Sequence, residues 1–205
     1  MFQLHGAGSA PSFDRPVQLP VTAPLTERLD AVLRVMPGIS AVALDPAIEA
    51  LARPLDLGPD LPVRRARLDS GRQLSVVSVP SRVWAQPNSR LRLFRLKAGA
   101  KAIGRPVLLA PEMAVSREPL LSNALLIARC ATLQVPPADH FALLSALVES
   151  GGELPMADAV VLMTRAEDPV AAILASAARR VVAIEIDHPL GPGTRVLSRP
   201  ARLRP

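Results

Sequence analysis

Residues 168–199 read DPVAAILASAARRVVAIEIDHPLGPGTRVLSR and carry the clearest structural pattern of the chain. Asp168 can cap a helix that has Pro169 in its first helical position. The apolar residues of this helix recur three and four positions apart, which is the spacing of one helical face. They are Val170, Ile173, Leu174, Ala177 and Ala178. Strand-like runs at 181–186 and 194–199 flank a loop rich in proline and glycine, and together they predict a hairpin.

The residues before this stretch predict two more helices and a short extended piece. Asp139 can cap a helix that ends at the glycine pair 151–152. The face of this helix is expected to carry Phe141, Leu144, Leu147 and Val148. Extended structure is expected at 153–155, and a second helix at 156–164. Helix, strand, helix, helix and hairpin is the order of a winged helix-turn-helix, so we predict such a domain over 134–200.

The residues before 134 predict an α/β domain over 25–133. The expected elements are a helix at 25–36, strands at 39–44, 63–68, 72–79 and 107–109, and helices at 88–103 and 118–130. A short helix and loop are expected at 45–62, and Gly104 is expected to end the helix at 88–103. We place Leu91, Phe94, Arg95 and Ala98 on one face of that helix. Residues 1–24 are interpreted as a flexible tail rich in proline and glycine, and 201–205 as a basic tail.

Composition excludes several classes of protein. The 205 residues are 49% hydrophobic with a mean hydropathy of +0.27, which is too apolar for a disordered chain. A single cysteine excludes a disulfide framework and any metal site built from several cysteines. No apolar run reaches the length of a membrane span, and no secretory signal is recognisable. We therefore expect a cytoplasmic protein with no membrane contact, no metal and no small-molecule cofactor.

The charge balance favours anionic partners. The net charge is +6, and arginine outnumbers lysine by 22 to 2. Guanidinium groups match phosphate bidentately, so DNA phosphate contact is one interpretation, and a coding bias toward arginine is the other. The candidate nucleic-acid-binding residues are Arg90, Arg92, Arg95, Lys97, Lys101, Arg179, Arg180, Arg195 and Arg199. Ser176 is the one polar side chain within 169–178, so that helix is not expected to read bases. The arginines at its end, Arg179 and Arg180, could hold phosphates or could simply complement the helix dipole.

Two segments and the order of elements carry a resemblance to a known family. The segments are Arg-Glu-Pro-Leu-Leu-Ser-Asn at 117–123 and Asp-His-Pro-Leu-Gly-Pro-Gly-Thr at 187–194. Over about 25–199 the chain resembles the TnsA-type transposon endonucleases and their relatives. The resemblance implies a restriction-endonuclease-like PD-(D/E)XK domain followed by a winged helix. It also implies a metal centre built from a first-helix glutamate, a Pro-Asp aspartate and a Glu-x-Lys strand, which together hold Mg²⁺.

Only part of that centre can be carried over to this chain. Glu27 matches the first-helix glutamate, although an exposed carboxylate at a helix start would look the same. Asp60 follows a proline and matches the aspartate, although Pro-Asp is also a common turn pair. The Glu-x-Lys positions fall on Ser78 and Pro80, or on the valines beside them, and neither register supplies a carboxylate or an amine. The resemblance therefore implies a nuclease fold with a degenerate centre.

The function expected from these observations is that of a non-catalytic accessory protein, associated with DNA or with a protein partner. Two alternatives stay open. The first is an active metal-dependent endonuclease with rearranged ligands around Glu27 and Asp60, which alone would need magnesium. The second is a winged-helix transcription regulator or protein-interaction module.

Overall fold

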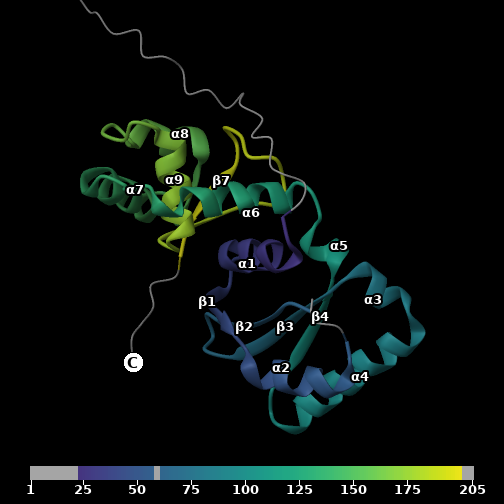
Figure 1. Ribbon diagram of the computed structural model, residues 1–205. Coiled ribbons are helices and arrows are strands. Elements are labelled where there is room, and N and C mark those ends of the chain that lie inside the picture. The colour runs from purple at the N-terminus through teal and green to yellow at the C-terminus, as the bar shows by residue number, and fades with distance from the viewer. Residues whose placement is uncertain (1–22, 58–60, 200–205) are drawn as a thin grey trace, which may run out of the picture.

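The computed structural model describes residues 23–57 and 61–199, which form a mixed α/β structure (Figure 1). The expected tails, apart from residues 23 and 24, lie outside the described residues, and so does Asp60. Within the described ranges, no helix combines the length and the apolar character needed to cross a membrane.

A four-stranded mixed sheet organises the N-terminal part. Its strands are β1 (Ile39–Leu44), β2 (Val63–Leu68), β3 (Gln73–Val79) and β4 (Val107–Pro111), in that spatial order. The first three strands run antiparallel, and β4 lies parallel to β3. Gly71 adopts a φ of +82° in the β2–β3 turn, which favours glycine there. All four expected strands are confirmed.

Helices cover both faces of this sheet (Figure 1). The helix α1 (Leu25–Val35) lies on one face, where Leu29 and Leu33 pack with Val76. The other face carries α2 (Pro46–Ala52), the 3₁₀ turn η1 (Arg53–Leu55), α3 (Ser81–Ala85) and α4 (Pro87–Ala102). There, Val77 packs against Leu93. Val76 and Val77 thus pack in the two cores on opposite faces of the sheet, because successive side chains of a strand point to opposite faces.

The face of α4 that the spacing predicted, with Leu91, Phe94, Arg95 and Ala98, is the exposed side of the helix. Leu93, Leu96 and Ala100 are buried against the sheet, whereas Leu91 and Phe94 are exposed. Apolar residues occur on both sides of this helix, so its sequence pattern could not identify the side that packs. The C-terminal end is as expected, because Gly104 follows the helix with a φ of +72°.

The C-terminal part begins with α5 (Glu112–Val115), α6 (Leu120–Arg129) and the 3₁₀ turn η2 (Cys130–Thr132). The elements that follow are α7 (Pro137–Glu149), β5 (Glu153–Pro155), α8 (Met156–Leu162), α9 (Pro169–Ala178), β6 (Val182–Ile184) and β7 (Arg195–Ser198). The three strands form an antiparallel sheet in the order β5-β7-β6. From α7 to β7 this order of elements is the one that the sequence predicted, whereas α5 and η2 were not expected.

The two expected aspartate caps have different outcomes. The Asp168 carboxylate accepts a hydrogen bond from the Ala171 backbone N–H at 2.9 Å, so this cap is confirmed. The Asp139 cap is wrong, because α7 already begins at Pro137 and Asp139 lies inside its first turn. Asp139 is buried, and both of its carboxylate oxygens accept from the Arg165 backbone N–H at 3.1 and 3.2 Å. It ties α7 to the loop before α9.

The packing face of α7 also differs from the expectation. Leu147 is buried as expected, but Phe141 and Val148 are exposed, and Leu143 is buried in their place. This helix, like α4, carries apolar side chains on more than one side. Spacing alone therefore identified the helix without fixing its orientation.

The helix α1 connects the two parts of the molecule. Leu29 and Leu33 face the first sheet, while Val32 and Val35 join the largest core cluster together with residues of α6 to α9. Figure 1 shows α1 between the four-stranded sheet and α6. The two predicted parts therefore share this helix as a common layer.

Candidate nucleic-acid and partner interface

The outer face of α4 carries a cluster of cations. Arg90, Arg95, Lys97 and Lys101 are exposed, and the helix contains no acidic residue. No hydrogen bond or ion pair formed within the described ranges engages their charged groups. Arg92 differs, because its guanidinium donates to the Asp56 carbonyl at 2.9 Å. Four of the five candidate cations of this helix are thus available to an outside partner.

Exposed apolar side chains lie among these cations. Leu91 is 54% exposed and Phe94 is 56% exposed. Ala98 and Ala102 extend this surface along the helix, and Ile103 follows it at 53% exposure. The outer face of α4 is therefore both cationic and apolar.

The helix α9 has the opposite environment. Six consecutive residues of this helix are buried, namely Ala172, Ile173, Leu174, Ala175, Ser176 and Ala177. They pack in the core shared with α1, α6, α7 and α8. The Ser176 hydroxyl donates to the Ala172 carbonyl at 3.0 Å, so it too is satisfied within the helix. A helix that is apolar on all sides is normally buried, and α9 offers no face to a DNA groove.

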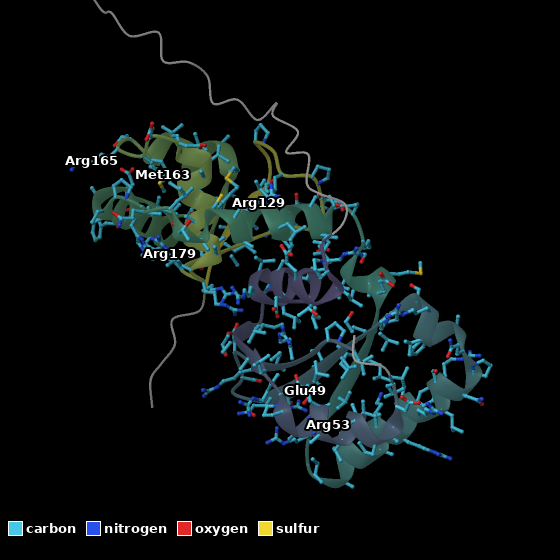
Figure 2. The ribbon with its side chains drawn as sticks, in the orientation of Figure 1. Glu49, Arg53, Arg129, Met163, Arg165 and Arg179 are labelled. Carbon is cyan, nitrogen blue, oxygen red and sulfur yellow. The ribbon has the colours of Figure 1, made fainter. Side chains whose placement is uncertain are left out.

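The two arginines at the end of α9 are engaged inside the molecule. Arg179 donates to the carbonyls of Ala131 and Leu133, at the end of η2 (Figure 2). Arg180 donates to the Ile39 carbonyl and, at 3.3 Å, to the Leu33 carbonyl. Backbone carbonyls at helix ends lack hydrogen-bond donors within the helix. The two guanidiniums are the donors for such carbonyls at the ends of α1 and η2. Both side chains therefore connect α9 to neighbouring elements.

The candidate cations near β7 are also partly occupied. Arg195 forms an ion pair with Glu153 of β5, and that hydrogen bond raises the pKa of Arg195. Arg199 donates to the Ile39 carbonyl at 3.4 Å. His188 is exposed in the loop before β7, and its carbonyl accepts from the Asn123 amide at 2.7 Å. This end of the molecule uses its cations mainly for its own structure.

The distribution of charge along the chain agrees with this contrast. Residues 25–118 contain 15 lysines and arginines against 9 acidic residues. Residues 119–199 contain 6 against 8. The positive charge thus belongs to the part built on the four-stranded sheet, whereas the C-terminal part is slightly acidic. A count by segment would have revealed this signal in the sequence, and the count over the whole chain obscured it.

The strand β3 passes through the positions where the resembled family carries Glu-x-Lys. Ser78 is completely buried, and its hydroxyl has no hydrogen-bond partner among the described residues. It shares the α1-facing side of the sheet with Val76. Val77 and Val79 point into the opposite core, and Pro80 is buried. No acid or base occurs at these positions.

The first-helix carboxylate that faces the sheet is Asp30 rather than the predicted Glu27. Asp30 forms a bidentate pair with Arg64 of β2, in which Nε and Nη2 donate at 2.6 and 2.9 Å. Their side chains are 27% and 12% exposed. Arg64 therefore neutralises the carboxylate at this place. In the described part of the chain, no three His, Cys, Asp or Glu side chains gather closely enough to hold a metal ion.

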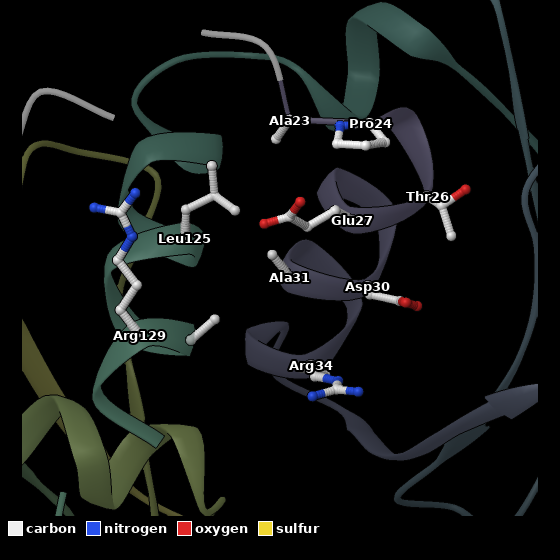
Figure 3. A pocket seen from close by; sticks show the side chains of 10 residues that line it. Ala23, Pro24, Thr26, Glu27, Asp30, Ala31, Arg34, Leu125 and Arg129 are labelled. Atoms are coloured by element: carbon white, nitrogen blue, oxygen red, sulfur yellow. The ribbon is translucent and has the colours of Figure 1, made fainter. Parts of the chain in front are cut away.

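Glu27 lines a shallow pocket between α1 and α6. Figure 3 shows Glu27 directed toward Leu125 of α6, and Asp30 also lines this pocket. The pocket measures about 470 Å³, and Arg34 and Arg129 also line it. Its walls thus carry both signs of charge over a partly apolar floor. Glu27 is separated from β3 by the thickness of its own helix.

The sequence reasoning missed a buried polar cluster around Asp45. The Asp45 carboxylate is completely buried and accepts from the Ser75 hydroxyl at 2.6 Å and from Arg105 at 3.0 Å. It also caps α2 by accepting from the Ile48 backbone N–H at 3.4 Å. The same Asp-Pro signature that predicted the Asp168 cap occurs at 45–46, so the cap could have been found. This cluster joins β1, β3 and the start of β4, which is a structural role.

Comparisons of this chain with protein-family models, with curated proteins and with solved structures found no match.

Proposed function

We propose that this chain is a non-catalytic accessory protein that binds a partner rather than cutting or reading DNA. In this proposal, the first part is a degenerate nuclease-like unit related to the TnsA-type endonucleases. Its order of helix, three antiparallel strands, helix and parallel strand supports that assignment. The second part is a winged helix, supported by its order of elements and by the β5-β7-β6 sheet.

The composition of β3 carries the proposal. A metal-dependent nuclease needs carboxylates that hold the ion and a group that activates water. Here the resemblance places a buried serine, Ser78, at the family's glutamate position. The α1 carboxylate that faces the sheet, Asp30, is bound to Arg64. The burial of α9 supports the second half of the proposal, because the winged helix has no exposed recognition surface. It also speaks against a transcription regulator that reads bases with α9.

A cleavage assay with divalent metals tests this proposal. The full chain is incubated with labelled duplex, single-stranded and branched DNA, with Mg²⁺ or Mn²⁺, and the DNA is resolved by size. We expect no product above that of a sample without protein. Product that disappears in Glu27→Ala or Asp30→Ala would overturn the proposal, because it would show a working centre at α1.

DNA association through phosphate contacts at α4 is the second candidate function. The four unengaged cations of α4 favour it. Binding of a labelled duplex is measured across a salt series, where each phosphate contact contributes about one unit to the slope of log K against log salt. Under this candidate, Lys97→Met with Lys101→Met lowers that slope by about two. Arg179→Met leaves it unchanged, because that guanidinium faces η2.

A further inference from the structure

The outer face of α4 has the pattern of a helix-docking surface. Leu91, Phe94, Ala98 and Ala102 follow one another at intervals of three and four residues, which places them in one line along the helix. We call these four residues the α4 seam. At 1.5 Å per residue the seam is about 16 Å long, or about three helical turns. All four residues are exposed.

The alanines give this line a definite shape. Phe94 and Leu91 project from its N-terminal half, and Ala98 and Ala102 leave its C-terminal half low. A partner helix can approach the backbone closely beside the alanines while its own large side chains pack around Phe94. A helical partner with a seam of leucine or isoleucine has this complementary shape.

The charges beside the seam define the chemistry of the partner. Arg90, Lys97 and Lys101 flank one side of the seam, and Arg95 flanks the other. In paired helices, the residues beside the apolar line choose the partner by charge. With no acidic residue on α4, a basic partner helix would be repelled. We propose that the α4 seam docks an acidic amphipathic helix of a protein partner.

A protein partner explains the seam better than nucleic acid does. Phosphate contacts account for the cations but leave Leu91 and Phe94 exposed to water, at 54% and 56% of their surface. Packing against apolar side chains would remove that surface from water, which is favourable. Phe141 of α7 is exposed to a greater degree, at 74%, yet it has no comparable set of cations on its helix. Phe141 is therefore a control for binding that depends on an exposed apolar side chain alone, without neighbouring cations.

Binding of designed peptides tests the inference, which rests on the proposed accessory role. The probe is a labelled peptide of 18 residues with leucine in the seam positions and glutamate beside them. Its control peptide has lysine in place of glutamate. Binding to the full chain is measured by fluorescence anisotropy at 150 mM salt. We expect the glutamate peptide to bind at least tenfold more tightly than the lysine peptide.

Variants locate the site. Leu91→Ser with Phe94→Ser should weaken the glutamate peptide at least tenfold, and Phe141→Ser should leave it unchanged. Lys97→Glu with Lys101→Glu should abolish the preference between the two peptides, because the two glutamates then balance Arg90 and Arg95 beside the seam. Circular dichroism confirms that each variant is folded, which is expected because all of these side chains are exposed.

Several results would overturn the inference. They are equal binding of both peptides, no binding of either peptide, and insensitivity to the seam variants. Binding of duplex DNA that depends on Lys97 and Lys101 but not on Phe94 would assign the face to nucleic acid instead. Self-association of the full chain that Phe94→Ser abolishes would assign it to a second copy. DNA cleavage would end the accessory role without changing the charge preference for peptides, so the two failures are distinguishable.

Discussion

The helices α4 and α9 both supply candidate cations in the sequence and have opposite positions in the structure. Five cations lie within α4, and two arginines directly follow α9. In α4 the cations are spread along the helix, so one side stays in water while Leu93 and Leu96 pack inward. In α9 the arginines stand only at the end, and the body of the helix is core. The placement of charge along a helix, more than its amount, decides which helix is left for a partner.

The arginines sharpen this contrast. Arg180 and Arg179 donate to carbonyls at the ends of α1 and η2, and Lys97 and Lys101 have no such contacts within the described structure. The same kind of charge thus stabilises the fold in one helix and stays available in the other. Substitutions that remove side chains in matched pairs should separate the two roles.

The largest expected effect belongs to the core of α9. Ile173→Ala should lower the free energy of unfolding by about 2–5 kcal/mol, because Ile173 is completely buried and its loss leaves a cavity. Leu91→Ala should change it by less than about 0.5 kcal/mol, because that side chain is half exposed. Urea unfolding followed by circular dichroism gives both values. Equal losses in the two variants would break the contrast between the helices.

The next effect concerns Asp45, below the end of α4. Asp45→Ala should cost about 2–3 kcal/mol, because the buried Ser75 hydroxyl and Arg105 both lose their acceptor. Asp187→Ala is the matched control, since Asp187 is exposed and pairs with Arg117 only at the surface. Its loss should stay within about 0.5 kcal/mol. Urea unfolding of both variants gives these losses. An Asp45→Ala variant with an unchanged free energy of unfolding would show that the Asp45 cluster does not stabilise the fold.

Arg180→Met should cost about 1–3 kcal/mol, since the Leu33 and Ile39 carbonyls lose a charged donor. Lys97→Met should be neutral within about 0.5 kcal/mol. Thermal unfolding of the two variants in parallel tests the assignment of one cation to structure and the other to the surface. A larger loss of stability for Lys97→Met than for Arg180→Met would contradict the assignment of Arg180 to the fold and Lys97 to the surface.

The smallest effect is a pH dependence near α3, the helix that leads into α4. The Ser81 backbone N–H donates to Glu112 at 2.9 Å, and this bond lowers the pKa of Glu112 below its usual value of 4.5. The stabilisation is therefore present above about pH 4.5 and is lost as the pH falls through the lowered pKa. Glu112→Gln should flatten this part of the stability profile between pH 3 and 5. An unchanged profile would mean that Glu112 does not titrate with folding.

The sequence predicted the elements better than their environments. Strands at 39–44 and 63–68, and the Asp168 cap, depend on local backbone preferences, and the structure confirms them. The packing faces of α4 and α7 depend on what the rest of the chain offers. The spacing did not say which side of α4 packs, and the expected face of α7 was wrong in part. Asp30 could not be selected over Glu27 from spacing, because its partner Arg64 lies 34 residues further along the chain.

The candidate interface shows the same limit. Counting cations identified α4 and the end of α9 alike, since a sequence gives the number of charges but not their partners. The engagement of Arg179 and Arg180 depends on the carbonyls of η2, α1 and β1, which tertiary packing brings to them. The spacing placed Leu91 and Phe94 on one face of their helix, and only the structure shows that this face is exposed.

Methyl NMR with a soluble paramagnetic agent tests the contrast between α4 and α9 most directly. The agent broadens signals from methyl groups that solvent can approach. We expect strong broadening for Leu91 and Ile103, which are 54% and 53% exposed, and little for the buried Ile173 and Leu174. Broadening of Ile173 and Leu174 equal to that of Leu91 would contradict the account, because α9 would then be open to solvent and to DNA.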